Sequence, residues 1–134
     1  MVSLVDFQEA IISLLKSDAN LVAAVGPEIR EDEYQATNWL YPCVRVGGPT
    51  LGAPMGVCNS RGVFQVLVYS TEASSLRCAA LTDLVVAALE KKVFVGVKVT
   101  MSTIYISVVR PPTRAAGSAW RATVECSTIA TTVV

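Results

Sequence analysis

The chain has 134 residues, of which 52% are hydrophobic and only 16% charged, and its formal net charge is zero. A chain of this length normally folds as one domain whose core needs no disulfide or metal, so we expect a single domain over residues 1–134. The absence of histidine removes the commonest general base and every Ser–His or Cys–His catalytic arrangement. So few charges on a small domain predict exposed apolar patches, which in soluble proteins mark docking surfaces.

High hydropathy does not come from a membrane span. A spanning helix needs about 20 successive apolar residues, and the longest uncharged run, Val46–Ser60, contains four glycines and two prolines. The first charged residues, Asp6 and Glu9, also have the wrong sign for a secretory signal. We therefore expect no membrane association, and synthesis and use in a cytoplasm.

Apolar residues at helical spacing predict an amphipathic helix from Leu4 to Ser17, with Ser3 as its N-cap. Asp18 is placed to cap a second, short helical turn over residues 20–25, which Gly26 and Pro27 close. The acidic stretch 28–33 that follows is predicted to be a solvated loop.

Residues 41–47 and 63–69 are rich in apolar and β-branched side chains and predict two strands. The glycines and prolines between Gly47 and Gly56 predict an irregular loop. From Thr71 or Glu72 to Lys92, leucine, valine and alanine recur at helical spacing, which predicts the longest helix, broad enough to cover a sheet.

The last third of the chain predicts strands joined as hairpins. A short strand is expected near residues 95–101 and another over 103–109, and Pro111, Pro112 and Gly117 predict a turn over 110–118. Residues 119–131 alternate, with Trp120, Ala122, Val124, Cys126 and Thr128 on one face. The order of elements predicts an α+β fold: a mostly antiparallel sheet of about four strands, a long helix packed on one face, and an N-terminal helix.

Signals for catalysis or cofactor binding are missing. There is no phosphate-binding glycine motif, and the four cysteines (Cys43, Cys58, Cys78, Cys126) are widely spaced without a C-x-x-C pair, which favours buried free thiols over a zinc site. Glu31, Asp32 and Glu33 are adjacent on a predicted loop, so their carboxylates point in different directions and favour a solvated segment over a magnesium site. We expect no enzyme activity and no cofactor.

Charge is unevenly distributed along the chain. Residues 1–33 hold seven acids and two bases, a balance of −5, whereas residues 91–124 hold six bases and no acid. Arg110, Arg114 and Arg121 form the main basic group. Three interpretations stay open: these arginines bind nucleic acid, they pair with acids of another copy in a head-to-tail contact, or the two ends neutralise each other within one subunit.

The order of these pieces resembles the tail-completion or tail-terminator family of long-tailed bacteriophages. The resemblance covers nearly the whole chain and lies in short phrases: "LVAAVGPEI" (Leu21–Ile29), "YPCVRV" (Tyr41–Val46), "RGVFQVLVYSTEASSLRCAALTDLVVAALE" (Arg61–Glu90), "TIYISVV" and "WRATVECSTIA". The segment 93–101 departs from the pattern because it is short and irregular.

This resemblance implies a structural protein of the virion, located at the junction of tail and neck. It would form a ring, expected to be a homohexamer, that caps the head-proximal end of the tail tube and contacts the tube protein and a neck or connector protein. DNA would pass through the ring without specific recognition. Glu31, Asp32 and Glu33 are candidates for an acidic lumen or for subunit pairing, and Arg110, Arg114 and Arg121 for subunit or ring–ring contacts.

Contacts with neighbouring rings are expected in the segments 47–61 and 110–118, because connecting loops commonly carry binding residues. Two other functions are weighed beside the tail ring: a neck or head-completion adaptor, and a small DNA-associated or regulatory domain of a mobile element.

Overall fold

The computed structural model of the chain describes residues 2–31, 40–54, 59–71, 73–115 and 119–133. Its helices are α1 (Leu4–Lys16), α2 (Ala19–Val25) and α3 (Leu76–Leu89). Its strands are β1 (Ile29–Glu31), β2 (Cys43–Pro54), β3 (Asn59–Ser70), β4 (Phe94–Val95), β5 (Val99–Met101), β6 (Tyr105–Arg114) and β7 (Trp120–Thr132).

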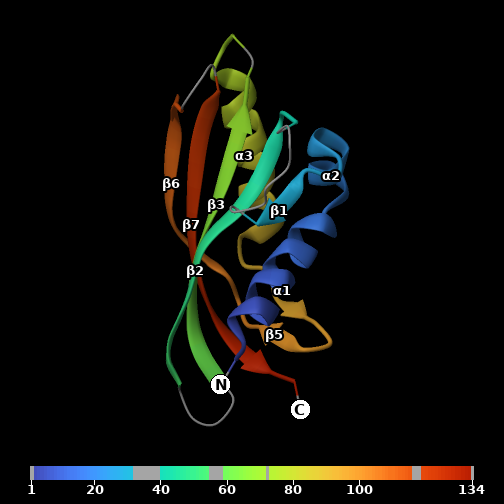
Figure 1. Cartoon of the computed structure of the whole chain (residues 1–134), viewed down its shortest axis with the longest axis vertical. Helices are drawn as coiled ribbons and strands as arrows, with labels where there is room; N and C mark the ends of the chain where they lie inside the picture. The colour runs from blue at the N-terminus through green and yellow to red at the C-terminus, as the bar shows by residue number, and fades with distance from the viewer. Residues whose placement is uncertain (1, 32–39, 55–58, 72, 116–118, 134) are drawn as a thin grey trace.

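All seven described strands belong to one mixed sheet, in the order β1-β2-β3-β7-β5-β4, with β6 also paired to β7. β1 runs parallel to β2, and the other pairs are antiparallel. One side of β7 pairs with β3 along the whole of β3, whereas its other side is shared between β6 and β5. The strands curl around one another, with the three helices to one side of the long strands (Figure 1).

The predicted α+β fold, with an antiparallel sheet of about four strands under one long helix, is therefore wrong. The sheet has seven described strands and is mixed, and the three helices are short, the longest having 14 residues. No helix in the described part of the chain is both long and apolar enough to cross a membrane.

Most of the error comes from segments that were predicted to be loops and instead form strands. β2 continues through the glycine-rich segment to Pro54, with register shifts after Gly47 and after Leu51. The left-handed backbone of Gly48, at φ 57°, accommodates the first of these irregularities. Likewise, β6 continues through Pro111 and Pro112, which is possible because proline is tolerated on an edge strand.

The acidic segment after α2 also differs from the prediction. Ile29 is fully buried and begins β1, which lies beside β2 in a register that pairs Ile29 with Val44. α3 begins at Leu76, later than predicted, and its last turn is followed by Lys91 in a left-handed conformation at φ 56°. The irregular segment near residue 95 is a hairpin of two very short strands, β4 and β5.

The N-terminal helix agrees closely with the sequence prediction. The Ser3 hydroxyl accepts a hydrogen bond from the Asp6 amide at 3.4 Å, and the Asp18 carboxylate caps α2 through the Leu21 amide at 2.9 Å. The apolar stripe of α1 is buried against the sheet, where Phe7 meets Phe64 of β3 edge to face, with ring centroids 6.0 Å apart.

The core lies between the helices and one face of the sheet. The face of β7 that the sequence alternation groups together is the inward one, buried at Ala122, Val124, Cys126 and Thr128. α3 contributes Cys78, Leu81, Val85, Ala88 and Leu89 to the same core. The opposite face of the sheet carries no described helix (Figure 1), and this places its side chains where another molecule can reach them.

Candidate assembly surfaces

The three arginines singled out in the sequence lie at one end of the sheet, on two neighbouring strands. Arg110 pairs in register with Thr123 of β7, and Arg121 of β7 pairs with Thr113 of β6. These two arginines therefore belong to the face of the sheet that lies away from the helices. Arg114 is in register with Trp120 and belongs to the other face. The structure thus brings the arginines to one end of the molecule but not to one face of the sheet.

Contacts within the subunit orient two of these arginines. Arg110 Nη2 donates to Glu125 Oε2 at 3.1 Å, and Gln65 Nε2 donates to the other carboxylate oxygen, also at 3.1 Å. The Arg114 guanidinium lies 4.6 Å from the centre of the Trp120 ring, in a cation–π contact. All three arginines are exposed to solvent, so these contacts hold the side chains in place without burying their charge.

The acidic candidates are only partly within the described structure. Glu31 is the last residue of β1, is half-buried, and pairs in register with Val46. Asp32 and Glu33 lie outside the described residues. The lumen and subunit-pairing interpretations of this segment therefore stay predictions.

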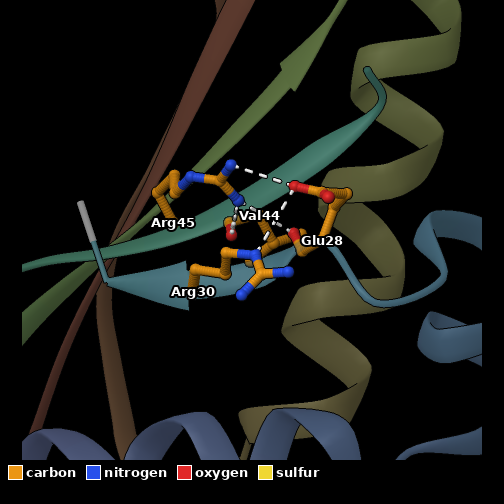
Figure 2. A network of polar contacts seen from close by, with 4 residues as sticks. All are labelled: Glu28, Arg30, Val44 and Arg45. Atoms are coloured by element: carbon orange, nitrogen blue, oxygen red, sulfur yellow. Dashed lines mark hydrogen bonds and ion pairs between the residues drawn. The ribbon is translucent and has the colours of Figure 1, made fainter. Parts of the chain in front are cut away.

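A buried ion pair that the sequence analysis did not identify lies beside this segment. The Arg45 side chain is fully buried in β2, and its Nη2 donates to Glu28 Oε2 at 3.1 Å. Arg45 Nη1 donates to the backbone carbonyls of Glu28 and Val44, each at 3.1 Å. Arg30 approaches the same carboxylate oxygen at 3.8 Å (Figure 2).

This network explains how a charged segment forms a strand next to the core. Glu28 supplies a carboxylate and a carbonyl to the same guanidinium, so it fixes the start of β1 against β2. The available signal was an arginine within an apolar strand, "CVRV", but its partner lies 17 residues earlier in the sequence. Only the parallel pairing of β1 with β2 brings the two together.

Apolar side chains are exposed along β6 and on the neighbouring helix-free face. Tyr105 is 62% exposed, Val108 39% and Val109 48%, although all three lie in a strand. Across the sheet, Val63 and Ile129 are also exposed on the face that Tyr105 shares. A shallow pocket of about 260 Å³ lies among Arg61, Tyr105 and Ile129. Exposed apolar area of this extent is typical of a docking surface.

A second surface is a groove of about 560 Å³ between α1 and the β4–β5 hairpin. Asp6 and Glu9 of α1 form one wall, and Phe94, Val95 and Val97 form the other. Val95 is 80% exposed and Val97 91% exposed. The hairpin therefore has solvent-exposed apolar side chains in the same groove as the carboxylates of Asp6 and Glu9. Lys98 also lines the groove, and its Nζ lies 3.7 Å from Asp6 Oδ1, whereas Glu9 is the more exposed of the two acids.

The three described cysteines are free and buried, as predicted. Burial raises the pKa of the Cys126 thiol to about 12, and raises that of Cys43 to about 11 despite the opposing charge of Arg45. The pKa of Cys78 is also raised by burial. Thiols of this kind are protonated at neutral pH and are poor nucleophiles or metal ligands. Within the described residues, no group of three or more cysteine, aspartate or glutamate side chains is placed to hold a metal ion.

No family model matches the chain, and no curated protein sequence matches it either. Its structure, however, is similar to a chain in the virion of a native gene transfer agent (GTA) particle. The TM-score is 0.77 at 17% sequence identity, over 92% of this chain and 93% of the other. A second solved structure has a TM-score of 0.58 at 18% identity, over 95% of this chain and 96% of its own. At these identities the likeness shows a shared fold: the chain has the fold of a component of the gene transfer agent virion.

Proposed function

We propose that the chain is a structural protein of a phage-like virion, without catalytic activity of its own. The observation that carries this proposal is the fold shared with a chain of the gene transfer agent virion over almost the full length of both. The exposed apolar side chains of β6 and of the β4–β5 hairpin support it, since they suit a subunit that is covered in an assembly. The absence of histidine and the protonated, buried cysteines are consistent with a role that needs no reactive group.

Within the virion, we propose the tail-terminator role: a ring, expected to be a hexamer, at the head-proximal end of the tail tube. Its partners would be copies of itself, the tail tube protein and a neck or connector protein, with DNA passing through the centre. The resemblance of short phrases such as "YPCVRV" (Tyr41–Val46) to tail-completion proteins supports this more specific role. A subunit with different exposed surfaces on opposite sides suits a ring, because head-to-tail contacts close into rings when the rotation allows.

The test is direct observation of the assembly. The purified chain is examined by native mass spectrometry and electron microscopy, alone and after mixing with polymerised tail tubes. We expect closed rings of about six subunits, in solution or bound at one end of the tubes. A chain that stays monomeric in both conditions, and leaves tube ends uncovered, would contradict the proposal. Tight retention of DNA by such a monomer would favour a DNA-associated function instead.

A further inference from the structure

The C-terminal half of β6 and the groove beside α1 have complementary properties. The first surface, here called the β6 end, lies along the outer edge of the sheet, where Val108, Val109, Arg110, Pro111 and Arg114 are all exposed. Val108 and Arg110 belong to the helix-free face of this edge, and Val109 and Arg114 to the other face. The second, here called the hairpin groove, is lined by Asp6, Glu9, Phe94, Val95, Val97 and Lys98, of which Lys98 pairs with Asp6. Each surface combines apolar side chains with charge: two arginines in the β6 end, and two acids against one lysine in the hairpin groove.

The two surfaces cannot meet within one subunit. In Figure 1 the C-terminal half of β6 lies at one end of the molecule, whereas α1 begins beside β5 toward the other end. A contact between them must therefore join two copies. Because it uses two different surfaces, such a contact is head-to-tail, and repeated copies of it generate a ring or a filament.

The prolines of β6 indicate how this contact is made. Pro111 lacks a backbone donor, as does Pro112, and the pairing of β6 with β7 is irregular between Arg110 and Thr113. Prolines on an edge strand oppose addition of a further strand. The side chains of the β6 end, rather than its backbone, are therefore the groups available to a partner.

The hairpin groove offers a matching receptor. Val95 and Val97 are among the most exposed apolar side chains in the described structure, so covering them contributes apolar burial. Glu9 lies in the same groove and offers a carboxylate to an incoming guanidinium. Charge complementarity of this kind sets the register and the choice of partner, while apolar burial supplies most of the affinity.

We infer that the β6 end of one copy docks into the hairpin groove of the next copy, and that this contact joins the subunits of the assembly. The inference rests on the proposed ring-forming function and assigns the subunit contact to named residues. It places the arginines Arg110 and Arg114 opposite Asp6 and Glu9, not opposite the segment 31–33.

The contact is tested by reversing the charges of each surface separately and then mixing the two variants, which should restore association. One variant carries Arg110→Glu and Arg114→Glu, which makes the β6 end acidic; the other carries Asp6→Lys and Glu9→Lys, which makes the groove basic. Each variant alone should associate at least about tenfold more weakly than wild type, since like charges then face each other. An equimolar mixture should assemble again, as alternating copies, because each altered surface meets its complement. Sedimentation velocity and micrographs measure both effects.

Two further variants keep the test interpretable. Asp83→Lys reverses an exposed charge of α3 outside both surfaces and should leave association unchanged. Val97→Lys places a cation in the groove at a side chain that is 91% exposed, so it should weaken association without unfolding the subunit. Circular dichroism and urea midpoints establish that each variant is folded.

The outcomes separate the inference from the function on which it rests. Wild-type rings with both double variants assembling normally would overturn the inference and leave the ring in place. Weakened variants whose mixture does not assemble would show that the two surfaces do not face each other. A wild type that is monomeric with and without tail tubes would overturn the ring and the inference together.

Discussion

The guanidinium of Arg45 is fully buried and is held by Glu28 through one carboxylate and one carbonyl contact. Replacing Arg45 with methionine would leave the Glu28 carboxylate half-buried beside only Arg30. Removing one partner of a buried pair costs about 3–5 kcal/mol, and we expect the lower part of this range because Arg30 stays within reach. Urea unfolding of Arg45→Met against wild type measures the loss.

A double variant is the matched control for this pair. Arg45→Met with Glu28→Gln removes both charges, so it should regain at least about 1 kcal/mol relative to Arg45→Met alone. If the double variant is no more stable than the single one, the cost of removing Arg45 comes from lost packing and not from the unpaired carboxylate.

The buried thiols predict a loss of stability at high pH. In the unfolded chain a thiol releases its proton near pH 8.5, whereas the pKa of Cys126 in the folded chain is about 12. Above pH 8.5 the unfolded state therefore loses a proton that the folded state keeps, and folding becomes less favourable as pH rises. Each such thiol lowers the unfolding free energy by up to about 1.4 kcal/mol per pH unit between the two pKa values.

The comparison with Cys126→Ala isolates this effect, because the two chains differ at no other ionisable side chain. Urea unfolding at pH 8, 9.5 and 10.5, with reductant present, should show the advantage of wild type over the variant shrinking as pH rises. A constant difference across this range would mean that Cys126 is accessible to water in the folded state.

At the scale of elements, local signals predicted those parts of the fold whose partners are close in sequence. α1 follows its apolar spacing and its Ser3 cap, and β7 follows its alternation. The strands that were missed depend on distant partners: β1 forms because β2 lies beside it, and the glycine-rich part of β2 is ordered by β3. Local composition in these segments favours a loop, and pairing across the sheet overrides it.

The same limit applies to the assembly surfaces. The sequence identified the arginines of the β6 end because residues 91–124 hold six bases and no acid, but it predicted them on or beside a turn. It did not identify the hairpin groove, because Glu9 and Val97 come from opposite parts of the chain and are brought together only by the packing of α1 beside β5. Composition predicted that apolar side chains would be exposed, but the fold decides which valines they are.

The packing of α1 onto β3 yields a prediction at the scale of elements. A methyl group added at Gly62 would overlap the ring of Phe7, which is fully buried in the core. Gly62→Ala should therefore lower the unfolding free energy by about 1–3 kcal/mol through overpacking. Gly52→Ala in β2 is the control, because its added methyl group meets only ordinary contacts at 3.5 Å or more.

A third variant attributes the effect to the ring. Phe7→Leu with Gly62→Ala should be destabilised by less than the sum of the two single changes, since the smaller side chain gives up the space that the methyl group needs. Additive losses, measured by thermal or urea unfolding, would show instead that Gly62 is required for its backbone conformation.

On the whole molecule, the opposite charges at the two ends of the sequence are partly neutralised within the subunit. Asp6 meets Lys98 at 3.7 Å, which joins the two ends. Arg110 instead meets Glu125, an acid that directly follows the basic segment in the sequence, at 3.1 Å. The interpretation in which the ends neutralise each other therefore applies at one described ion pair, Asp6–Lys98, on the exposed surface. Pairs of this kind contribute little to folding, and they leave the charged groups accessible to a second copy.

Salt provides the measurement for the whole assembly. If arginines of the β6 end pair with acids of the hairpin groove, each exposed pair contributes up to about 1 kcal/mol to association, and two pairs together correspond to at most about thirtyfold in Kd. Raising ionic strength from 0.1 M to 1 M shortens the screening length from about 10 Å to about 3 Å, so the dissociation constant should rise, by up to this factor. Apolar burial is not screened, so association should weaken without being abolished.

Sedimentation velocity across the salt series gives the dissociation constant, and urea midpoints at the same salts establish that the subunit stays folded. A dissociation constant that is unchanged or lower at 1 M would assign the contact to apolar burial alone and remove the charges from it.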